Sequence, residues 1–407
     1  MKGLTCRIYS LTFAALVLCT VLTAMAHASD HLDSPATIMN PQADIADVYA
    51  WTSPDGRHLN LIMTIQGHTF SDKVQYTLHV DSGKTFGSTD ASIPIVCRFA
   101  AANSANCKVG DVDSASGDPT DPKGLEGRHH RFRVYAGLRD DPFYNNVKGL
   151  IGAYQTANAA IKNGAAVDAA GCAHLDDSTV KTIVDQMGHT EGGPAQNLLY
   201  NWTVSAIVIS VDLGAVSKGG KLLAVWSSTS IGGKPLDRHA LPFVKNHLLG
   251  SAPFSTDDAS GVRREEFNAA LPATSAGFIA DMQKTLAFFD SLDGRCGNQI
   301  LADSQESPAR YRVLAKLFAE DRLRVNTASK VCTQFFAVEL ANLAGDKQMS
   351  SDCGGRAPTY DASNVWRSLL IAGTTTGTTD GLHHDEHPPS DTVFPFLAPP
   401  DPKGVDH

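Results

Sequence analysis

Two pairs of aspartates are the residues whose type and spacing most directly suggest chemistry in this sequence. Asp44 and Asp47 lie near a predicted strand, and Asp140 and Asp141 follow Arg139. Closely spaced carboxylates in loops supply oxygen ligands of the kind that Ca²⁺ takes, about six to eight in number. Calcium is therefore one hypothesis if the two pairs meet. We favour the structural alternative, in which Asp44 and Asp141 form turns and Arg139 pairs with an acid.

The beginning of the chain has the three parts of a secretory signal peptide over residues 1–28. Two basic residues precede an apolar stretch from residue 11 to about residue 25, and small residues stand at Ala26 and Ala28. Cleavage after Ala28 predicts a periplasmic or secreted protein. No later apolar run reaches the roughly 20 residues that a membrane-spanning helix needs.

The predicted cleavage also changes the charge of the chain. It removes two basic residues and no acid, so the formal charge moves from −9 to −11. This acidic balance argues against nucleic acid and anionic lipid as partners.

The same cleavage exposes a possible copper site at the new N-terminus. The mature chain would begin with Ser29, Asp30 and His31, which places an imidazole third from a free amine. The amine, two backbone nitrogens and the imidazole can form a square-planar set that suits Cu²⁺ or Ni²⁺. The alternative is that His31 simply packs or is solvated beside a processing site.

A second histidine-rich segment lies near the other end, at residues 383–387. It holds three histidines and two acids in five residues. It lacks the H-E-x-x-H spacing of a helical metalloprotease site. Because it lies between Gly381 and Pro388, we interpret it as a mobile loop that binds metal adventitiously rather than as a catalytic site.

Six cysteines remain after the predicted cleavage, an even number that is typical of disulfides in an exported chain. Six cysteines allow about 15 pairings. We favour local closure of Cys97 with Cys107 and of Cys332 with Cys353, which leaves Cys172 for Cys296. No C-x-x-C motif supports a zinc or redox site instead.

Strand signals dominate residues 29–260. Alternating and β-branched runs at 46–51 and 59–65 flank a Ser-Pro-Asp-Gly turn and predict a hairpin. Further strands are predicted at 76–80, 93–99, 132–135, 204–211 and 222–228.

Helical spacing appears at 150–161 and becomes common in residues 261–407, with helices predicted at 278–292 and 308–321. Residues 110–124 and the chain from 373 onward are predicted surface loops. The sequence thus predicts one exported α+β domain, mainly β, over 29–407. It has an antiparallel β-sandwich core, helical insertions and a helix-rich C-terminal third.

Several segments in order resemble one group of exported bacterial proteins, the domain of unknown function 4331 family. They are residues 29–35, 43–51, 53–55, 136–143, 223–227 and 352–356. The similarity covers essentially the whole mature chain, and Asp-Cys-Gly-Gly-Arg at 352–356 marks a subgroup with an added C-terminal region. Members often begin Ser-Ser-His-Arg-Glu-Ala-Pro, so His31 and Pro35 match while the residues between them differ. The resemblance implies an exported, strand-rich fold and carries no agreed activity.

Function is less constrained than location. The sequence has no G-x-S-x-G and no phosphate-binding glycine loop. The first hypothesis is a binding protein for a metal ion, copper or calcium, or for a small ligand. The alternatives are an exported enzyme that uses a metal or carboxylate site, and a structural module of the envelope.

Overall fold

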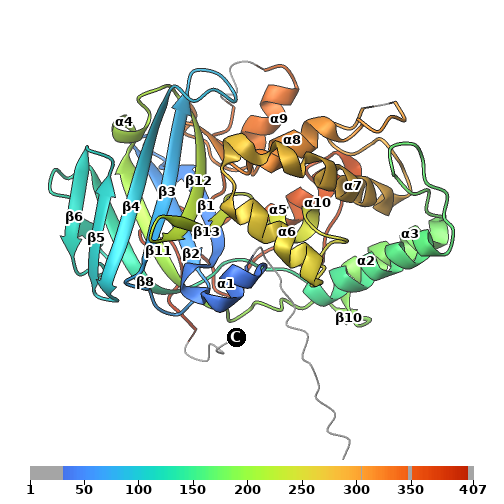
Figure 1. Ribbon diagram of the computed structural model, residues 1–407, viewed down its shortest axis with the longest axis horizontal. Helices are drawn as coiled ribbons and strands as arrows, with labels where there is room; N and C mark the ends of the chain where they lie inside the picture. Colours follow the sequence, from blue (N-terminus) through green and yellow to red (C-terminus); the bar gives the residue numbers. More distant parts are fainter. Residues whose placement is uncertain (1–30, 304, 347–350, 402–407) are drawn as a thin grey trace, which may run out of the picture.

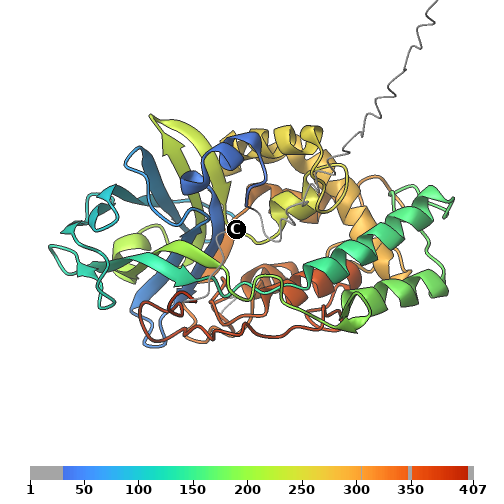
Figure 2. The same cartoon turned by 90° about the horizontal axis from the view of Figure 1, so that it is seen from below.

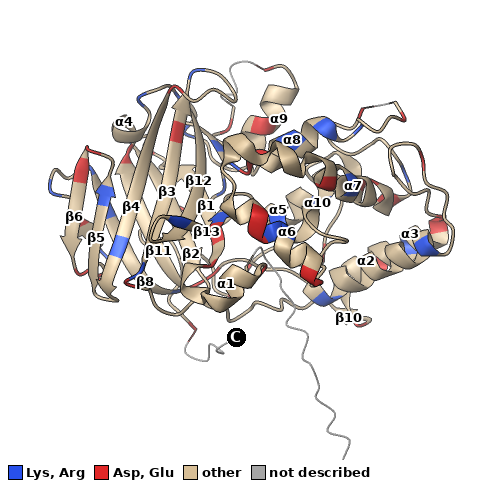
Figure 3. Ribbon diagram, viewed as in Figure 1, with Lys and Arg blue, Asp and Glu red and all other residues tan. Residues whose placement is uncertain are grey.

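The computed structural model describes residues 31–303, 305–346 and 351–401, so the predicted signal peptide, Ser29 and Asp30 lie outside the described residues. Two antiparallel sheets form one half of the molecule, and helices form the other half (Figure 1). Acidic and basic residues are interspersed over both halves (Figure 3). No helix in the described part is both long and apolar enough to cross a membrane.

The first sheet has the strand order β1-β2-β11-β8-β7. Its strands are β1 (Ile45–Thr52), β2 (His58–Ile65), β11 (Thr203–Asp212), β8 (Phe132–Asp140) and β7 (Leu125–Glu126). The predicted hairpin is confirmed, because β1 and β2 pair with Tyr49 opposite Ile62 and the Gly56 N–H closes the turn on the Ser53 carbonyl at 2.8 Å.

The second sheet has the order β13-β12-β3-β4-β5-β6, and a further strand pairs with β12. Its strands are β13 (Lys234–His239), β12 (Leu222–Ile231), β3 (Val74–Gly83), β4 (Ala91–Ala101), β5 (Ser104–Val109), β6 (Asp113–Gly117) and β14 (Leu323–Asn326). The prediction of a loop over 110–124 is wrong in part, because β6 completes the sheet there. Its Ser and Gly residues give a weak strand signal, and pairing with β5 supplies the order instead.

Helices lie in the connections between strands and in part of the chain after residue 244, where β14 and the irregular residues after 372 also lie, so the predicted helix-rich C-terminal third is not evident. The helices are α1 (Pro35–Met39), η1 (Pro41–Ala43), α2 (Val147–Lys162), α3 (Asp177–Met187), α4 (Leu213–Val216), α5 (Val244–Leu248), α6 (Asp258–Ala269), η2 (Pro272–Phe278), α7 (Ile279–Asp290), η3 (Ser291–Asp293), α8 (Arg312–Glu320), α9 (Ala337–Leu343) and α10 (Ala362–Ala372). A two-stranded ribbon, β9 (His189–Thr190) with β10 (Gly193–Pro194), follows α3. The fold is therefore α+β and mainly β.

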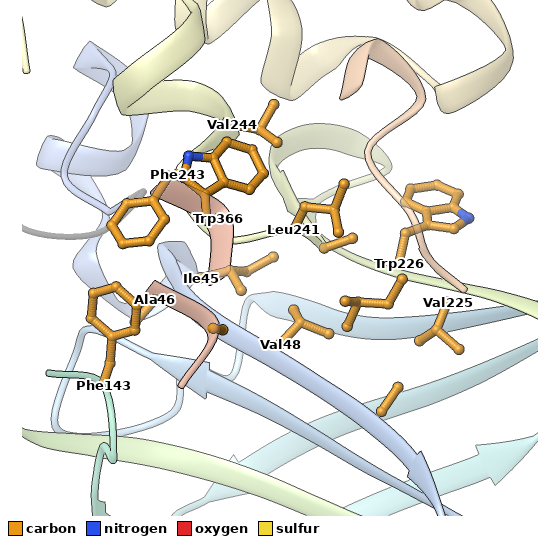
Figure 4. Packing of buried hydrophobic residues seen from close by; sticks show 14 of the residues in the cluster. Ile45, Ala46, Val48, Phe143, Val225, Trp226, Leu241, Phe243, Val244 and Trp366 are labelled. Atoms are coloured by element: carbon orange, nitrogen blue, oxygen red, sulfur yellow. The ribbon is translucent and has the colours of Figure 1, made fainter. Parts of the chain in front are cut away.

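One apolar core joins the sheets to the helices. Ile45 of β1 lies on the side of Trp366 and Val48 on the side of Leu241, so the strand that begins the first sheet also anchors the helical half (Figure 4). Every residue of β1 is buried. Burial on both faces explains why this strand lacks a clean alternation of apolar and polar residues.

A second, smaller core lies on the other face of the first sheet. Tyr49 and Trp51 of β1 pack there against Ala357, Phe396 and Leu397. Figure 2 shows the last part of the chain, in red, running from the helices back to the sheets. The prediction of a surface loop from residue 373 onward is confirmed over the described residues, which form no helix or strand and are mostly exposed or half-buried; Phe396 and Leu397 are buried and cover a sheet face.

The described cysteines form three disulfides. They join Cys97 to Cys107, Cys172 to Cys296 and Cys332 to Cys353, the pairs that the sequence favoured. Cys97 and Cys107 are register partners on β4 and β5. Disulfides of this number are consistent with folding in an oxidising compartment.

We expect the bond between Cys172 and Cys296 to contribute the most stability, because it spans 124 positions and the bond between Cys97 and Cys107 only 10. Replacing each pair by alanines should lower the free energy of unfolding by about 5 and about 3 kcal/mol respectively, on the chain-entropy account. Urea denaturation of the two double variants measures both. A larger loss for the shorter loop would contradict this ranking.

Candidate metal centre

The end of β8 and the histidine-rich segment near the C-terminus meet at one buried point. Asp140, the last residue of β8, lies beside Asp385 and His387. One donor atom from each of the three residues lies within 4.8 Å of the donor atoms of the other two. His387 Nδ1 is 3.1 Å from Asp140 Oδ1. Two carboxylates and one imidazole thus converge from positions far apart in the chain.

The segment that carries His387 is held in place by its neighbours. Tyr144 donates its hydroxyl hydrogen bond to the His383 carbonyl at 2.9 Å. The Asn197 side-chain amide donates to Asp385 at 3.3 Å and to Glu386 at 2.8 Å. These hydrogen bonds dock residues 383–387 against two other parts of the fold, and the interpretation of the segment as an adventitious metal-binding loop stays a prediction.

Asp140 is almost completely enclosed, with only 1 % of its surface exposed. Its Oδ1 faces His387, whereas Oδ2 is buried and has no hydrogen-bond partner among the described residues. A buried carboxyl oxygen without a donor favours the protonated acid, and Asp140 can share that proton with Asp385. A bound cation would replace the proton.

The electrostatics of this cluster favour a bound cation. Burial, the charge of Asp385 and the charge of Asp141 raise the pKa of Asp140 to about 9. Burial also raises the pKa of Asp385 to about 7, and Glu386 adds to this effect while His387 opposes it. In the described part of the chain no lysine or arginine forms an ion pair with Asp140 or Asp385. The cluster therefore gathers more acid than base in a desolvated place.

Asp141 belongs to a different network from its neighbour. It accepts hydrogen bonds from the Tyr49 hydroxyl and from Thr64 Oγ1, both at 2.9 Å. Asp47 lies in the same buried network, where Arg356 forms an ion pair with it. Burial raises the pKa of Asp47 to about 7, and Arg356 opposes the rise. Asp47 and Asp141 therefore meet around a guanidinium.

The Asp-Cys-Gly-Gly-Arg motif positions that guanidinium. Arg356 and Ala50 exchange backbone hydrogen bonds of 2.9 Å in each direction, so this segment pairs with β1. Gly355 has a φ of +67°, and a Cβ there would lie 2.1 Å from the Ala50 carbonyl oxygen. Only glycine allows the chain to approach β1 so closely.

Asp44 is separate from both of these groups. Its Oδ2 accepts a hydrogen bond of 2.7 Å from the Leu32 backbone N–H. Burial and the charges of Asp237 and Asp33 raise its pKa well above the usual value. The four predicted aspartates are thus divided among three environments, and they do not form one calcium cage.

Arg139, which we expected to pair with an acid, stacks instead on the Tyr135 ring at 4.3 Å.

The predicted copper ligands are placed only in part. Ser29 and Asp30 lie outside the described residues. The His31 ring is buried, with 2 % exposed, and packs on the Trp202 ring at 4.7 Å between centroids. The copper site stays a prediction.

A polar cleft of about 540 Å³ lies at the opposite end of β8. Asn60 and Ser210 line it and are hydrogen-bonded to each other at 2.9 Å. Arg131 and His58 approach Asp212 from two sides, at 2.9 and 3.4 Å. A small polar molecule would fit this space.

Comparison of the chain with known protein families, with curated proteins and with solved structures found no match. The resemblance to the domain of unknown function 4331 family therefore stays a prediction. The candidate site has to be interpreted from its own geometry.

We expect Arg356→Met to destabilise the fold by about 3 to 5 kcal/mol, because it leaves the Asp47 carboxyl buried without its cation. Since the folded-state pKa of Asp47 is then raised further above its unfolded value, the variant should lose more stability as the pH rises above about 4. Denaturant unfolding between pH 5 and pH 8 measures this. The double variant Arg356→Met with Asp47→Asn should recover part of the lost stability. If the double variant were no more stable than Arg356→Met alone, the pairing of Arg356 with Asp47 would be contradicted.

Proposed function

We propose that this chain is an exported protein that binds a divalent transition-metal ion through Asp140, Asp385 and His387. The observation that carries the proposal is the buried, unsatisfied Asp140 Oδ2 in a cluster whose third member is an imidazole. Three disulfides support an exported location, either periplasmic or secreted.

The donor set favours some metals over others. Mg²⁺ and Ca²⁺ prefer oxygen ligands alone, whereas imidazole suits Zn²⁺, Fe²⁺, Ni²⁺ and Cu²⁺. Two carboxylates with one imidazole therefore fit Mn²⁺ or Zn²⁺ better than calcium. Glu386 and Asn197 lie at the same place, and they would orient the ligating carboxylate of Asp385.

We expect one equivalent of Mn²⁺ or Zn²⁺ to bind the untagged protein. His387→Ala should weaken binding by about 100-fold or more, because losing an outer partner of a ligand alone costs 10-fold to 100-fold. Calorimetric titration and elemental analysis after dialysis measure both. His383→Ala is the matched control, since that histidine lies in the same motif but pairs with Asp361. Equal loss in the two variants would mean adventitious binding and would remove the proposal.

We also expect metal affinity to rise with pH. The pKa values of about 9 for Asp140 and about 7 for Asp385 mean that both carboxyls hold protons at pH 6. A cation must displace these protons, so affinity should increase about tenfold per pH unit for each proton released.

Titrations in buffers of different ionisation enthalpy count the protons released on binding. Asp140→Asn should make the pH dependence shallower by one proton. Affinity that is constant from pH 6 to pH 8 would show that these carboxyls are not the ligands.

A small-ligand function is the second candidate, and the cleft of about 540 Å³ favours it. The cleft and the metal cluster lie at opposite ends of β8, since Phe132 lines the cleft and Asp140 belongs to the cluster. Ligand screening with the His387→Ala variant separates the two functions. Turnover that appears only after metal loading would instead support the enzyme alternative.

A further inference from the structure

A lysine and three aspartates form a buried group where α1, β13 and α5 come together (Figure 1). Lys245 of α5 has no exposed side-chain surface, and neither have Asp33 and Asp237. Lys245 Nζ lies 3.0 Å from Asp33 Oδ2 and 2.8 Å from Asp237 Oδ1. Asp44, which is also fully buried, completes the group. The metal cluster uses none of these residues.

The two carboxyls next to Lys245 are held differently. Asp237 also accepts the backbone N–H groups of Ile45 and Arg238, each at 2.8 Å. Asp33 receives only long contacts on its other oxygen, 3.4 Å from Thr37 Oγ1 and 3.3 Å from the Asn268 amide. Burial raises the pKa of Asp237 to about 7, and Lys245 and the backbone donor Ile45 oppose the rise. Asp33 has no backbone donor of this kind among the described residues, so its carboxyl group is the less constrained of the two.

Asp44 supplies the acid that an acyl transfer needs. Its Oδ2 accepts from the Leu32 backbone N–H, which places it beside Asp33 in the fold, and its Oδ1 has no hydrogen-bond partner among the described residues. Burial, with the nearby charges of Asp237 and Asp33, raises its pKa well above the usual value. Burial therefore favours the protonated form of Asp44, which is the form that can act as an acid.

We propose that Lys245 and Asp33 form an intramolecular amide bond, with Asp44 as the acid that assists the reaction. Three carboxyl groups and one ammonium share a fully buried place, and burial penalises every charge among them. In the proposed reaction a proton first moves from the Lys245 ammonium to a carboxylate, which gives the neutral amine and the carboxylic acid that form the amide.

The reaction balances without an outside reagent. The Nζ lone pair attacks Cγ of Asp33, and Asp44 donates its proton to the hydroxyl group that departs as water. Nζ then gives its second proton to the Asp44 carboxylate. One N–C bond forms, one C–O bond breaks, and the acid is regenerated. The product ties the chain just before α1 to α5 by a bond that reductants do not break.

Peptide mapping of the unmodified protein tests the proposal directly. After reduction and alkylation, the intact mass should be lower than that of the linear mature chain by one water. Trypsin should leave the peptide with Asp33, which ends at Arg57, joined to the peptide 239–263 with Lys245 uncleaved. Fragmentation must then place the link on Asp33 rather than on Asp44.

An intact mass without the loss of water would overturn the proposal. A loss confined to one linear peptide would do the same, since it would be a succinimide. A link between Lys245 and Asp237 would overturn the assignment of the acyl group.

Two variants examine the chemistry. Asp33→Asn should lose ammonia instead of water and give a product of the same mass as crosslinked wild type, because the same amide forms. Asp44→Asn keeps both reacting groups and should reduce the crosslinked fraction strongly. Full crosslinking in Asp44→Asn would remove Asp44 from the reaction, and Lys245→Arg is the control without a link.

Discussion

The buried pair of Asp47 and Arg356 is the interaction on which the arrangement of this chain depends. A guanidinium inside a protein requires a nearby anion, and Asp47 on β1 provides it. The Tyr49 ring lies 4.2 Å from the same guanidinium and adds a cation–π contact. Because Arg356 also pairs its backbone with Ala50, residues that are about 300 positions apart become neighbours in one layer. The C-terminal part of the chain then has to run beside β1, where Phe396 and Leu397 cover Tyr49 and Trp51 and Asp385 and His387 reach the end of β8.

The predictions from sequence succeeded where the determining forces are local. The hairpin of β1 and β2 follows from a Ser-Pro-Asp-Gly turn between two apolar runs, and α2 from helical spacing. The disulfide between Cys97 and Cys107 follows from two short strands that face each other. The β6 strand was missed because Ser and Gly have little intrinsic strand preference, and its partner strand orders it.

Only part of the candidate site could be predicted from the sequence, because its residues come together from distant parts of the chain. Asp140 was among the predicted acids, but its partner His387 lies 247 positions away, and no local spacing connects the two. Glycine and proline around residues 383–387 correctly predict irregular backbone. They cannot tell a free loop from a docked one, because docking depends on distant side chains such as Tyr144 and Asn197. The three histidines and two acids in five residues are the signal that the sequence offers for this site, and we interpreted them as an adventitious metal-binding loop.

The partners of the other buried carboxyl groups show what is unusual about Asp140 in the candidate metal site. Asp380, for example, pairs with Arg367 at 2.8 Å. Where no cation is near, backbone N–H groups serve instead, as they do for Asp113. Asp140 departs from this pattern, since its side chain faces the half-buried His387 and its Oδ2 has no donor among the described residues. Its neighbour Asp385 accepts the His387 backbone N–H and the Asn197 amide, so one carboxyl of the candidate site is left facing a single imidazole. Such an imbalance is what a site for a mobile cation requires, because a permanent lysine or arginine would compete with the metal for the same oxygens.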